Sequence, residues 1–155
     1  GLGAPHWVHG IRAAITGISR SAGADQIIRA ALESIAFQVH DVIERMLERG
    51  EISLPALHVD GGPTGNRFLM QFLADILAVP VRVGGIEEVS ARGVAFVAGL
   101  ATGLWKDQEA LAPMVKPSAI YEPTMEGSKR RALLQGWKHA LDQVFAGAEE
   151  EGAEV

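Results

Sequence analysis

Cysteine is absent from the 155 residues, so the chain can form no disulfide and carry out no thiol chemistry. Long apolar runs are absent as well, since none reaches the roughly 18 residues expected of a membrane-spanning segment. The start of the chain shows no signal-peptide pattern. From these absences we expect a cytoplasmic protein that contacts no membrane.

An excess of charge of one sign is also absent, except at the end of the chain. The formal net charge is −5, but four of the 19 acidic residues lie after Phe145, which leaves 15 acidic against 14 basic residues. A nearly neutral body offers no electrostatic attraction for nucleic acid. We therefore expect no nucleic-acid partner, and we predict that residues 148–155 form an acidic, disordered tail.

The length is that of one ordinary domain, which we place at residues 1–147. The chain begins at Gly1 and runs directly into a loop with Gly3 and Pro5, so we expect it to be a segment cut from a longer protein. We also expect further strands of its sheet to lie upstream of Gly1.

Alternating strand-like and helix-like segments run along the chain. Apolar residues at helical spacing mark the helices, and short apolar runs between turn residues mark the strands. The predicted strands cover residues 11–19, 54–59 and 80–83, with an extended segment at 120–123. The predicted helices cover residues 25–49, 67–78, 90–104 with Ser90 as N-cap, 107–114 and 125–145. This order predicts an α/β layer fold with a largely parallel sheet.

The most informative stretch joins the strand at 54–59 to the helix at 67–78. Gly61 and Gly62 let the backbone take a positive φ and approach a ligand without a Cβ in the way. Pro63 suits a turn or a first helical position, and the helix start offers unpaired N–H groups to a phosphate or a polar ligand edge. Such turns also occur for packing reasons, so the residue pattern alone leaves nucleotide binding and a purely structural turn both open.

Several motifs in this order resemble the C-terminal domain of the FGGY family of carbohydrate kinases, and within it the chain is most similar to glycerol kinases. The resemblance covers residues 1 to about 145. It is carried by Gly1-Leu2-Gly3-Ala4-Pro5-His6-Trp7, by Ala13-Ala14-Ile15-Thr16-Gly17-Ile18 with Gln26-Ile27 and Ala30-Ala31-Leu32-Glu33, by Val59-Asp60-Gly61-Gly62 with Asn66 and Leu69-Met70-Gln71-Phe72, and by Ala91-Arg92-Gly93-Val94-Ala95 with Gly103-Leu104-Trp105.

The resemblance implies an actin-like ATPase, ribonuclease-H-like fold, of which this chain is the C-terminal part with helices flanking the sheet. It implies an enzyme that uses ATP and Mg²⁺ to transfer the γ-phosphoryl group to a hydroxyl of glycerol or a related polyol or sugar. By position, Gly62 and Asn66 contact the nucleotide, Gly61 lets the turn form, and Asn66 can offer both a donor and an acceptor. The resemblance also implies a homo-oligomer as one candidate state.

The resemblance places no catalytic residue in this chain. The family's catalytic aspartate and its sugar contacts lie upstream of Gly1, so the chain alone is expected to be inactive. Pro63-Thr64-Gly65 departs from the small apolar residues usual in glycerol kinases, which weakens glycerol as the substrate relative to another polyol or ketose. The alternatives are a non-catalytic binding or assembly module on the same fold and an actin-like ATPase outside carbohydrate metabolism.

Other polar and aromatic residues favour structural roles. Asp60 is expected to accept hydrogen bonds from nearby backbone N–H groups. His6 and His9 have a ligand-like spacing but no nearby Cys, Asp or Glu partner, so we predict no metal site. Trp7, Trp105 and Trp137 are interpreted as core or interface anchors.

Overall fold

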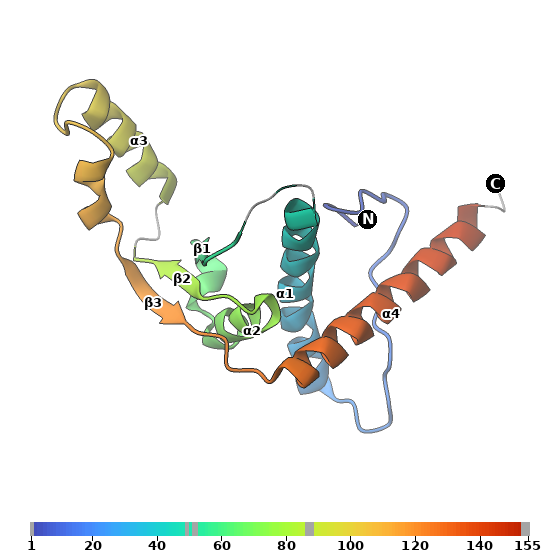
Figure 1. The fold of residues 1–155 in the computed structure, drawn as a ribbon. Helices are drawn as coiled ribbons and strands as arrows, with labels where there is room; N and C mark the ends of the chain where they lie inside the picture. The colour runs from blue at the N-terminus through green and yellow to red at the C-terminus, as the bar shows by residue number, and fades with distance from the viewer. Residues whose placement is uncertain (1, 49, 51–52, 86–88, 153–155) are drawn as a thin grey trace. The chain divides into compact units, whose positions relative to one another are not determined.

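The computed structural model describes residues 2–48, 50, 53–85 and 89–152. The chain divides into two compact units, one made of Gly1–Ser53 with Thr124–Val155 and the other of Leu54–Pro123. Figure 1 shows the elements of each unit. The single domain expected over residues 1–147 stays a prediction.

Two long helices form the frame of the first unit, α1 (Ala24–Glu48) and α4 (Gly127–Gly152). The predicted helix at 25–49 matches α1 closely, and Arg49 lies outside the described residues. The helix predicted at 125–145 begins two residues later than predicted and continues to Gly152. The acidic, disordered tail expected at residues 148–155 stays a prediction. Alanine and glutamate, which dominate this end of the chain, are strong helix formers. Residues 153–155 lie outside the described part.

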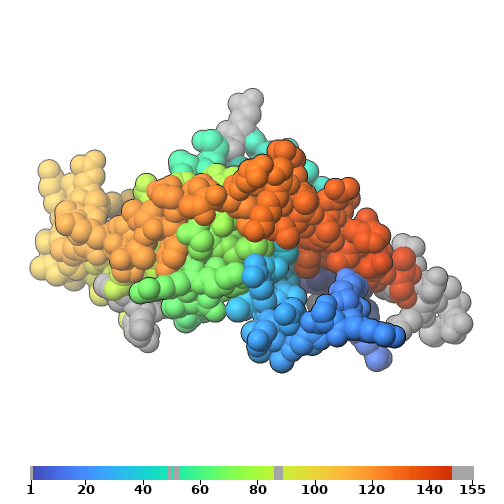
Figure 2. All heavy atoms as spheres, turned by 90° about the horizontal axis from the view of Figure 1, so that it is seen from below, coloured from blue at the N-terminus to red at the C-terminus, as the bar shows by residue number. Residues whose placement is uncertain are grey.

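The segment before α1 corrects the predicted strand at residues 11–19. This segment has no regular secondary structure, although Leu2 and Val8 form an isolated antiparallel bridge ahead of it. Ile11 is buried, but Ile15 and Ile18 are exposed, and the segment lies at the surface in Figure 2, in blue. A strand needs a hydrogen-bonded neighbour, and none is present among the described residues. Gly17, with φ of 73°, also interrupts an extended backbone.

The second unit contains a three-stranded sheet in the order β1 (Leu57–Val59), β2 (Val81–Gly84) and β3 (Pro117–Tyr121). β1 and β2 are parallel, as expected for strands joined through a helix. β3 pairs with β2 in the antiparallel direction. The expected largely parallel sheet is therefore mixed within the described residues, and the extended segment predicted at 120–123 begins earlier, at Pro117.

Helix α2 (Arg67–Leu77) covers one face of this sheet and supplies most of the unit's core. Its buried residues are Leu69, Met70, Phe72, Leu73, Ala74, Asp75, Ile76 and Leu77, and they meet the buried Val81 and Val83 of β2. The Gln71 side chain donates to the Asp75 carboxylate (3.1 Å) and to the carbonyl of Glu122 (2.8 Å). These two bonds tie α2 to the chain that leaves β3, and Ala78, in the left-handed conformation, ends the helix.

Helix α3 (Val89–Ala101) and the short 3-10 helix η2 (Glu109–Met114) complete the second unit. Ser90 lies inside α3, so its prediction as the N-cap is wrong. The Trp105 ring lies over Gly99 so closely that a Cβ at Gly99 would overlap it. Trp105 also meets Phe96 edge to face, with ring centroids 5.6 Å apart. A glycine near the end of α3 therefore lets the following turn fold back onto the helix.

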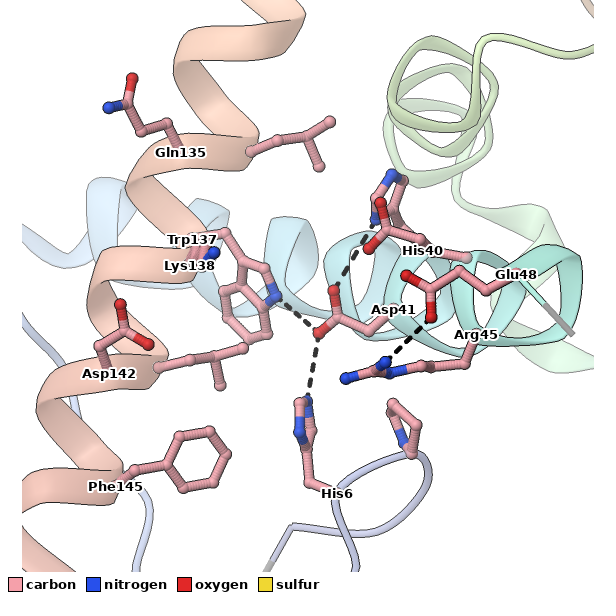
Figure 3. Close-up of a pocket in the computed structure, with 14 residues that line it drawn as sticks. His6, His40, Asp41, Arg45, Glu48, Gln135, Trp137, Lys138, Asp142 and Phe145 are labelled. Atoms are coloured by element: carbon pink, nitrogen blue, oxygen red, sulfur yellow. Dashed lines mark hydrogen bonds and ion pairs between the residues drawn. The ribbon is translucent and has the colours of Figure 1, made fainter.

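A mostly buried carboxylate, Asp41 on α1, joins three parts of the first unit (Figure 3). The indole N–H of Trp137 on α4 donates to it at 2.8 Å. His6 from the N-terminal loop lies 3.5 Å from one carboxylate oxygen, and His40 lies 3.7 Å from the other. Trp137 also stacks on Phe37, with centroids 5.3 Å apart. Trp137 is therefore the expected core anchor, and Trp105 is anchored in the other unit.

Trp7 is the exception among the tryptophans, because 66% of it is exposed. Its φ of 57° lies in the left-handed region, which is uncommon for a residue other than glycine. In the N-terminal loop the inward polar contact is made instead by the preceding residue, His6. The interpretation of Trp7 as a core anchor is therefore wrong within this chain.

The contact between Gly99 and Trp105 leads to the first prediction. Gly99→Ala should lower the free energy of unfolding by about 1–3 kcal/mol, because the added methyl displaces the Trp105 ring. The matched control is Gly93→Ala in the same helix, where a Cβ meets nothing within 4 Å. That change should raise stability by about 0.5–1 kcal/mol. Urea unfolding followed by circular dichroism measures both, and equal effects of the two changes would contradict the packing argument.

The second prediction concerns acid stability. Burial raises the pKa of Asp41, but His40, Trp137 and His6 outweigh burial and hold that pKa below its ordinary value of 3.8. A carboxyl with a lowered folded-state pKa stabilises the protein above its unfolded-state pKa, and this contribution is lost as the pH falls through the folded-state value. Asp41→Asn should therefore flatten the loss of stability below about pH 4.

Urea unfolding followed by tryptophan fluorescence at a series of pH values from 2 to 7 tests this prediction. At pH 7 the Asp41→Asn change should cost about 1–2 kcal/mol, because a charge-assisted hydrogen bond becomes a neutral one. Asp142→Asn is the control, since Asp142 is exposed on α4 and makes no hydrogen bond or ion pair among the described residues. An Asp41→Asn protein as acid-sensitive as the unchanged protein would refute the assignment.

Candidate functional site

The turn between β1 and α2 brings the three predicted site residues together. β1 ends at Val59, and the short 3-10 helix η1 (Gly62–Gly65) leads to Asn66 and α2. Gly61, Gly62 and Asn66 thus lie within six consecutive residues at the carboxyl end of a parallel strand. In α/β folds, ligands bind at this end of the strands.

The backbone conformation demands glycine at only one of the two adjacent glycines of this turn. Gly61 has φ of 99° and ψ of 176°, a conformation that residues with a Cβ rarely adopt. At Gly62 the φ is not positive, and an added Cβ would meet nothing within 4 Å. The fold therefore requires a glycine at residue 61 and leaves room for a side chain at residue 62.

Asn66 caps the helix that follows. Its side-chain oxygen accepts a hydrogen bond from the backbone N–H of Leu69 at 3.1 Å, which is the usual N-cap contact. Its own backbone N–H donates to the Pro63 carbonyl at 3.1 Å. The side-chain oxygen is thus engaged within the fold, and the amide NH₂ group is the part of Asn66 left to donate outward.

Thr64 is the residue of this turn whose role the sequence reasoning missed. Its backbone N–H and its hydroxyl both donate to the carbonyl of Gly61, at 3.0 and 2.7 Å. The signal was present in the sequence, since a Thr hydroxyl commonly bonds backbone groups a few residues away in turns. The sequence analysis gives Thr64 no role beyond its place in Pro63-Thr64-Gly65, a departure from the family pattern.

Asp60 does not have the structural role that the sequence predicts for it. Its side chain accepts no hydrogen bond in the part of the chain that the structure describes, and the residue is exposed. A Cβ at Gly84 would overlap its carboxylate, so the ends of β1 and β2 approach closely because Gly84 lacks a side chain. The Asp60 carboxylate is thus placed beside the turn by contact with β2.

A concave region lies in the first unit, around Asp41 (Figure 3). It is a cavity of about 670 Å³ between α1, α4 and the N-terminal loop, and it carries an ion pair of Arg45 with Glu48 at 2.9 Å. Asp41 itself is engaged by Trp137. Across the described residues, no group of three or more His, Asp or Glu side chains converges as metal ligands would. Among the polar groups of this cavity, Asp41, Trp137 and His6 join the three segments around it.

None of the helices in the described part of the chain combines the length and the apolar character that crossing a bilayer requires.

Other polar residues of the sequence do not join a site. Glu33, part of one of the family motifs, pairs within its own helix with Arg29 at 2.8 Å. His58 on β1 is exposed, and His6 faces Asp41.

Comparison with known proteins gives the same family through sequence and through structure. The model for the C-terminal domain of the FGGY family of carbohydrate kinases matches residues 1–102. The chain is 48% identical over 145 residues to a glycerol kinase of Alkaliphilus metalliredigens, covering 94% of this chain and 29% of that protein. It is 49% identical over 145 residues to glycerol kinase 1 of Thermotoga maritima, covering 94% of this chain and 30% of that protein. The chain thus spans about three tenths of the length of the curated relatives it matches.

Among solved structures, the chain resembles Plasmodium falciparum glycerol kinase with ADP, with a TM-score of 0.86 and 32% identity over 93% of this chain and 29% of that one. It also shares the fold of xylulose kinase from Lactobacillus acidophilus, with a TM-score of 0.72 and 24% identity over 86% of this chain and 26% of that one. The predicted actin-like ATPase fold, of which this chain is a C-terminal part, is thereby confirmed. The family model matches about two thirds of the chain, including the strand, the glycine turn and the capped helix, so the chain belongs to the FGGY family of carbohydrate kinases.

Proposed function

We propose that this chain is the adenosine-binding part of an ATP-dependent carbohydrate kinase. The complete enzyme transfers the γ-phosphoryl group of ATP to a hydroxyl of glycerol or a related polyol or sugar. The observation that carries the proposal is the turn of residues 61–66, in which the fold explains Gly61 and Asn66 but gives no reason for a glycine at residue 62. The family relationship and the ADP named with the glycerol kinase neighbour support the same reading.

In our proposal, Gly62 lets the nucleotide approach the backbone closely. An exposed residue without a Cβ lets the planar edge or sugar of a nucleotide lie against the backbone, and the Gly62 N–H makes no hydrogen bond among the described residues. This N–H donates to the ligand in our proposal. The start of α2 adds a weak positive potential at the same place.

The proposed role of Asn66 is divided between its two polar atoms. The oxygen holds the start of α2 through Leu69, while the NH₂ group donates to an acceptor atom of the adenosine. Binding energy and helix stability are therefore coupled at this residue. The two effects can be separated by substitutions that keep the cap and remove the donor.

In our proposal, this chain positions the nucleotide and supplies no group that takes part in the chemical step. We assign no catalytic residue to it, and we propose that the base and the substrate contacts lie elsewhere in the complete protein. Mg²⁺, which neutralises phosphate charge in phosphoryl transfer, is proposed to arrive with the nucleotide. The described residues hold no cluster of three carboxylate or histidine ligands that would fix the ion in this chain.

The alternative function is a non-catalytic binding or assembly module on the same fold. Phosphoryl transfer by the complete gene product, assayed with ATP, Mg²⁺ and a panel of polyols and ketoses, separates the two functions. Transfer to one of these acceptors supports the kinase, whereas nucleotide binding without transfer to any of them favours the module. A cytoplasmic location and a homo-oligomeric state remain part of the proposal.

Calorimetric titration with ADP tests the site directly. The unchanged chain should bind ADP, and Gly62→Val should weaken binding about 5- to 150-fold, because a side chain in the contact costs about 1–3 kcal/mol. Gly93→Ala, in α3 and away from the turn, should leave the affinity unchanged. If the folded chain binds ADP equally well with valine at residue 62, the proposed site is wrong.

Substitutions at Asn66 separate capping from ligand contact. Asn66→Asp keeps an acceptor for the Leu69 N–H and should leave stability within about 0.5 kcal/mol, whereas Asn66→Ala should cost about 0.5–2 kcal/mol. Both changes remove the NH₂ donor, so both should weaken ADP binding, by about three- to tenfold. Asn66→Ser, a neutral cap, shows whether the added charge of aspartate matters. Full ADP affinity in both capped variants would show that Asn66 acts only on the helix.

A further inference from the structure

We infer that Thr64 is a positioning residue that aims the Gly62 N–H at the nucleotide, an assignment that rests on the proposed function. Thr64 donates twice to one acceptor, the carbonyl of Gly61, through its N–H at 3.0 Å and its hydroxyl at 2.7 Å. Two donors on one carbonyl restrict its direction more than one donor would. The orientation of the peptide group that joins Gly61 to Gly62 is thereby set.

The planarity of that peptide group connects Thr64 to the ligand side of the turn. In a trans peptide the carbonyl of one residue and the N–H of the next lie in one plane and point in opposite directions. Holding the Gly61 carbonyl toward Thr64 therefore directs the Gly62 N–H away from Thr64. This N–H makes no hydrogen bond among the described residues, and Gly62 is exposed. Thr64 thus fixes the direction of a donor that the fold itself does not use.

The composition of the turn explains why such a restraint matters. Residues 61, 62 and 65 are all glycine, and glycine loses more conformational freedom on ordering than any other residue. Fixing a backbone residue in one conformation costs entropy, and a ligand that has to order the turn bears that cost. Pro63, with its fixed φ, and the bond from the Asn66 N–H to the Pro63 carbonyl restrain the second half of the turn.

The Thr64 hydroxyl restrains the first half of the turn, next to Gly61. An apolar side chain at residue 64 would have no hydroxyl to bond the Gly61 carbonyl. In this chain, Pro63 and Thr64 together preorganise a turn that contains three glycines. The Thr64 hydroxyl thus has a function in nucleotide affinity.

The test compares Thr64→Val, which has nearly the same shape but no hydroxyl, with Thr64→Ser, which keeps it. We expect Thr64→Val to weaken ADP binding about three- to tenfold, because one net hydrogen bond is lost, and Thr64→Ser to stay within about twofold of the unchanged chain. In the complete gene product, Thr64→Val should raise the KM for ATP by a similar factor and leave kcat unchanged. Thr64→Ala, which also lacks the hydroxyl, gives the same comparison if valine disturbs the fold.

Two readouts distinguish positioning from stability alone. The amide signal of Gly62 in ¹H–¹⁵N spectra should shift or broaden in Thr64→Val without ligand, while the amides of α2 stay in place. An ADP affinity equal to that of the unchanged chain in both Thr64→Val and Thr64→Ala would overturn the inference and leave the proposed function standing. If the unchanged, folded chain fails to bind ADP, both the inference on Thr64 and the proposed nucleotide site are overturned. This outcome therefore differs from the failure of the Thr64 inference alone.

Discussion

The chain can pass from β1 to the start of α2 in so few residues because residue 61 has no side chain. A φ of 99° with ψ of 176° is open to glycine and strained for other residues, and it turns the backbone directly from the strand into η1. Every other contact of the candidate site follows from that reversal. It brings the Gly61 carbonyl within reach of Thr64, and it allows Asn66 to stand at the first turn of α2.

The site is consequently a small assembly of local contacts supported by a larger core. The hydrogen bonds that shape it span at most three residues in sequence. The support comes from α2, whose inward residues pack against β2, and from Gln71, which bonds to Asp75 and to the chain beyond β3. A rigid helix of this kind keeps the capped start at a constant position relative to the end of β1. The ligand contact that we propose can therefore depend on a turn with three glycines and still have a defined geometry.

The first unit is held together in a different way, by a charged group shared among distant segments. Asp41 meets Trp137, which lies 96 residues further along the chain, and it also faces His6 from the N-terminal loop. A carboxylate that is mostly withdrawn from water is costly unless it is hydrogen-bonded, so its partners have to stay in place. The stacking of Trp137 on Phe37 keeps the indole donor beside the carboxylate. The glycine turn thus depends on short-range hydrogen bonds, whereas the first unit depends on a long-range side-chain contact around Asp41.

The sequence by itself determined the helices, the strand and glycine turn, and the identity of the family. Amphipathic spacing, glycine pairs and an Asn before a helix depend on neighbours a few residues away, so they can be read in order along the chain. Only the tertiary structure decided that residues 11–19 form no strand, that β3 runs antiparallel to β2, and that Trp137 but not Trp7 is an anchor. It also decided which polar atoms of Thr64 and Asn66 are occupied within the fold. These outcomes depend on which partner lies opposite a strand or beside a carboxylate, and that choice is made by packing between segments far apart in sequence.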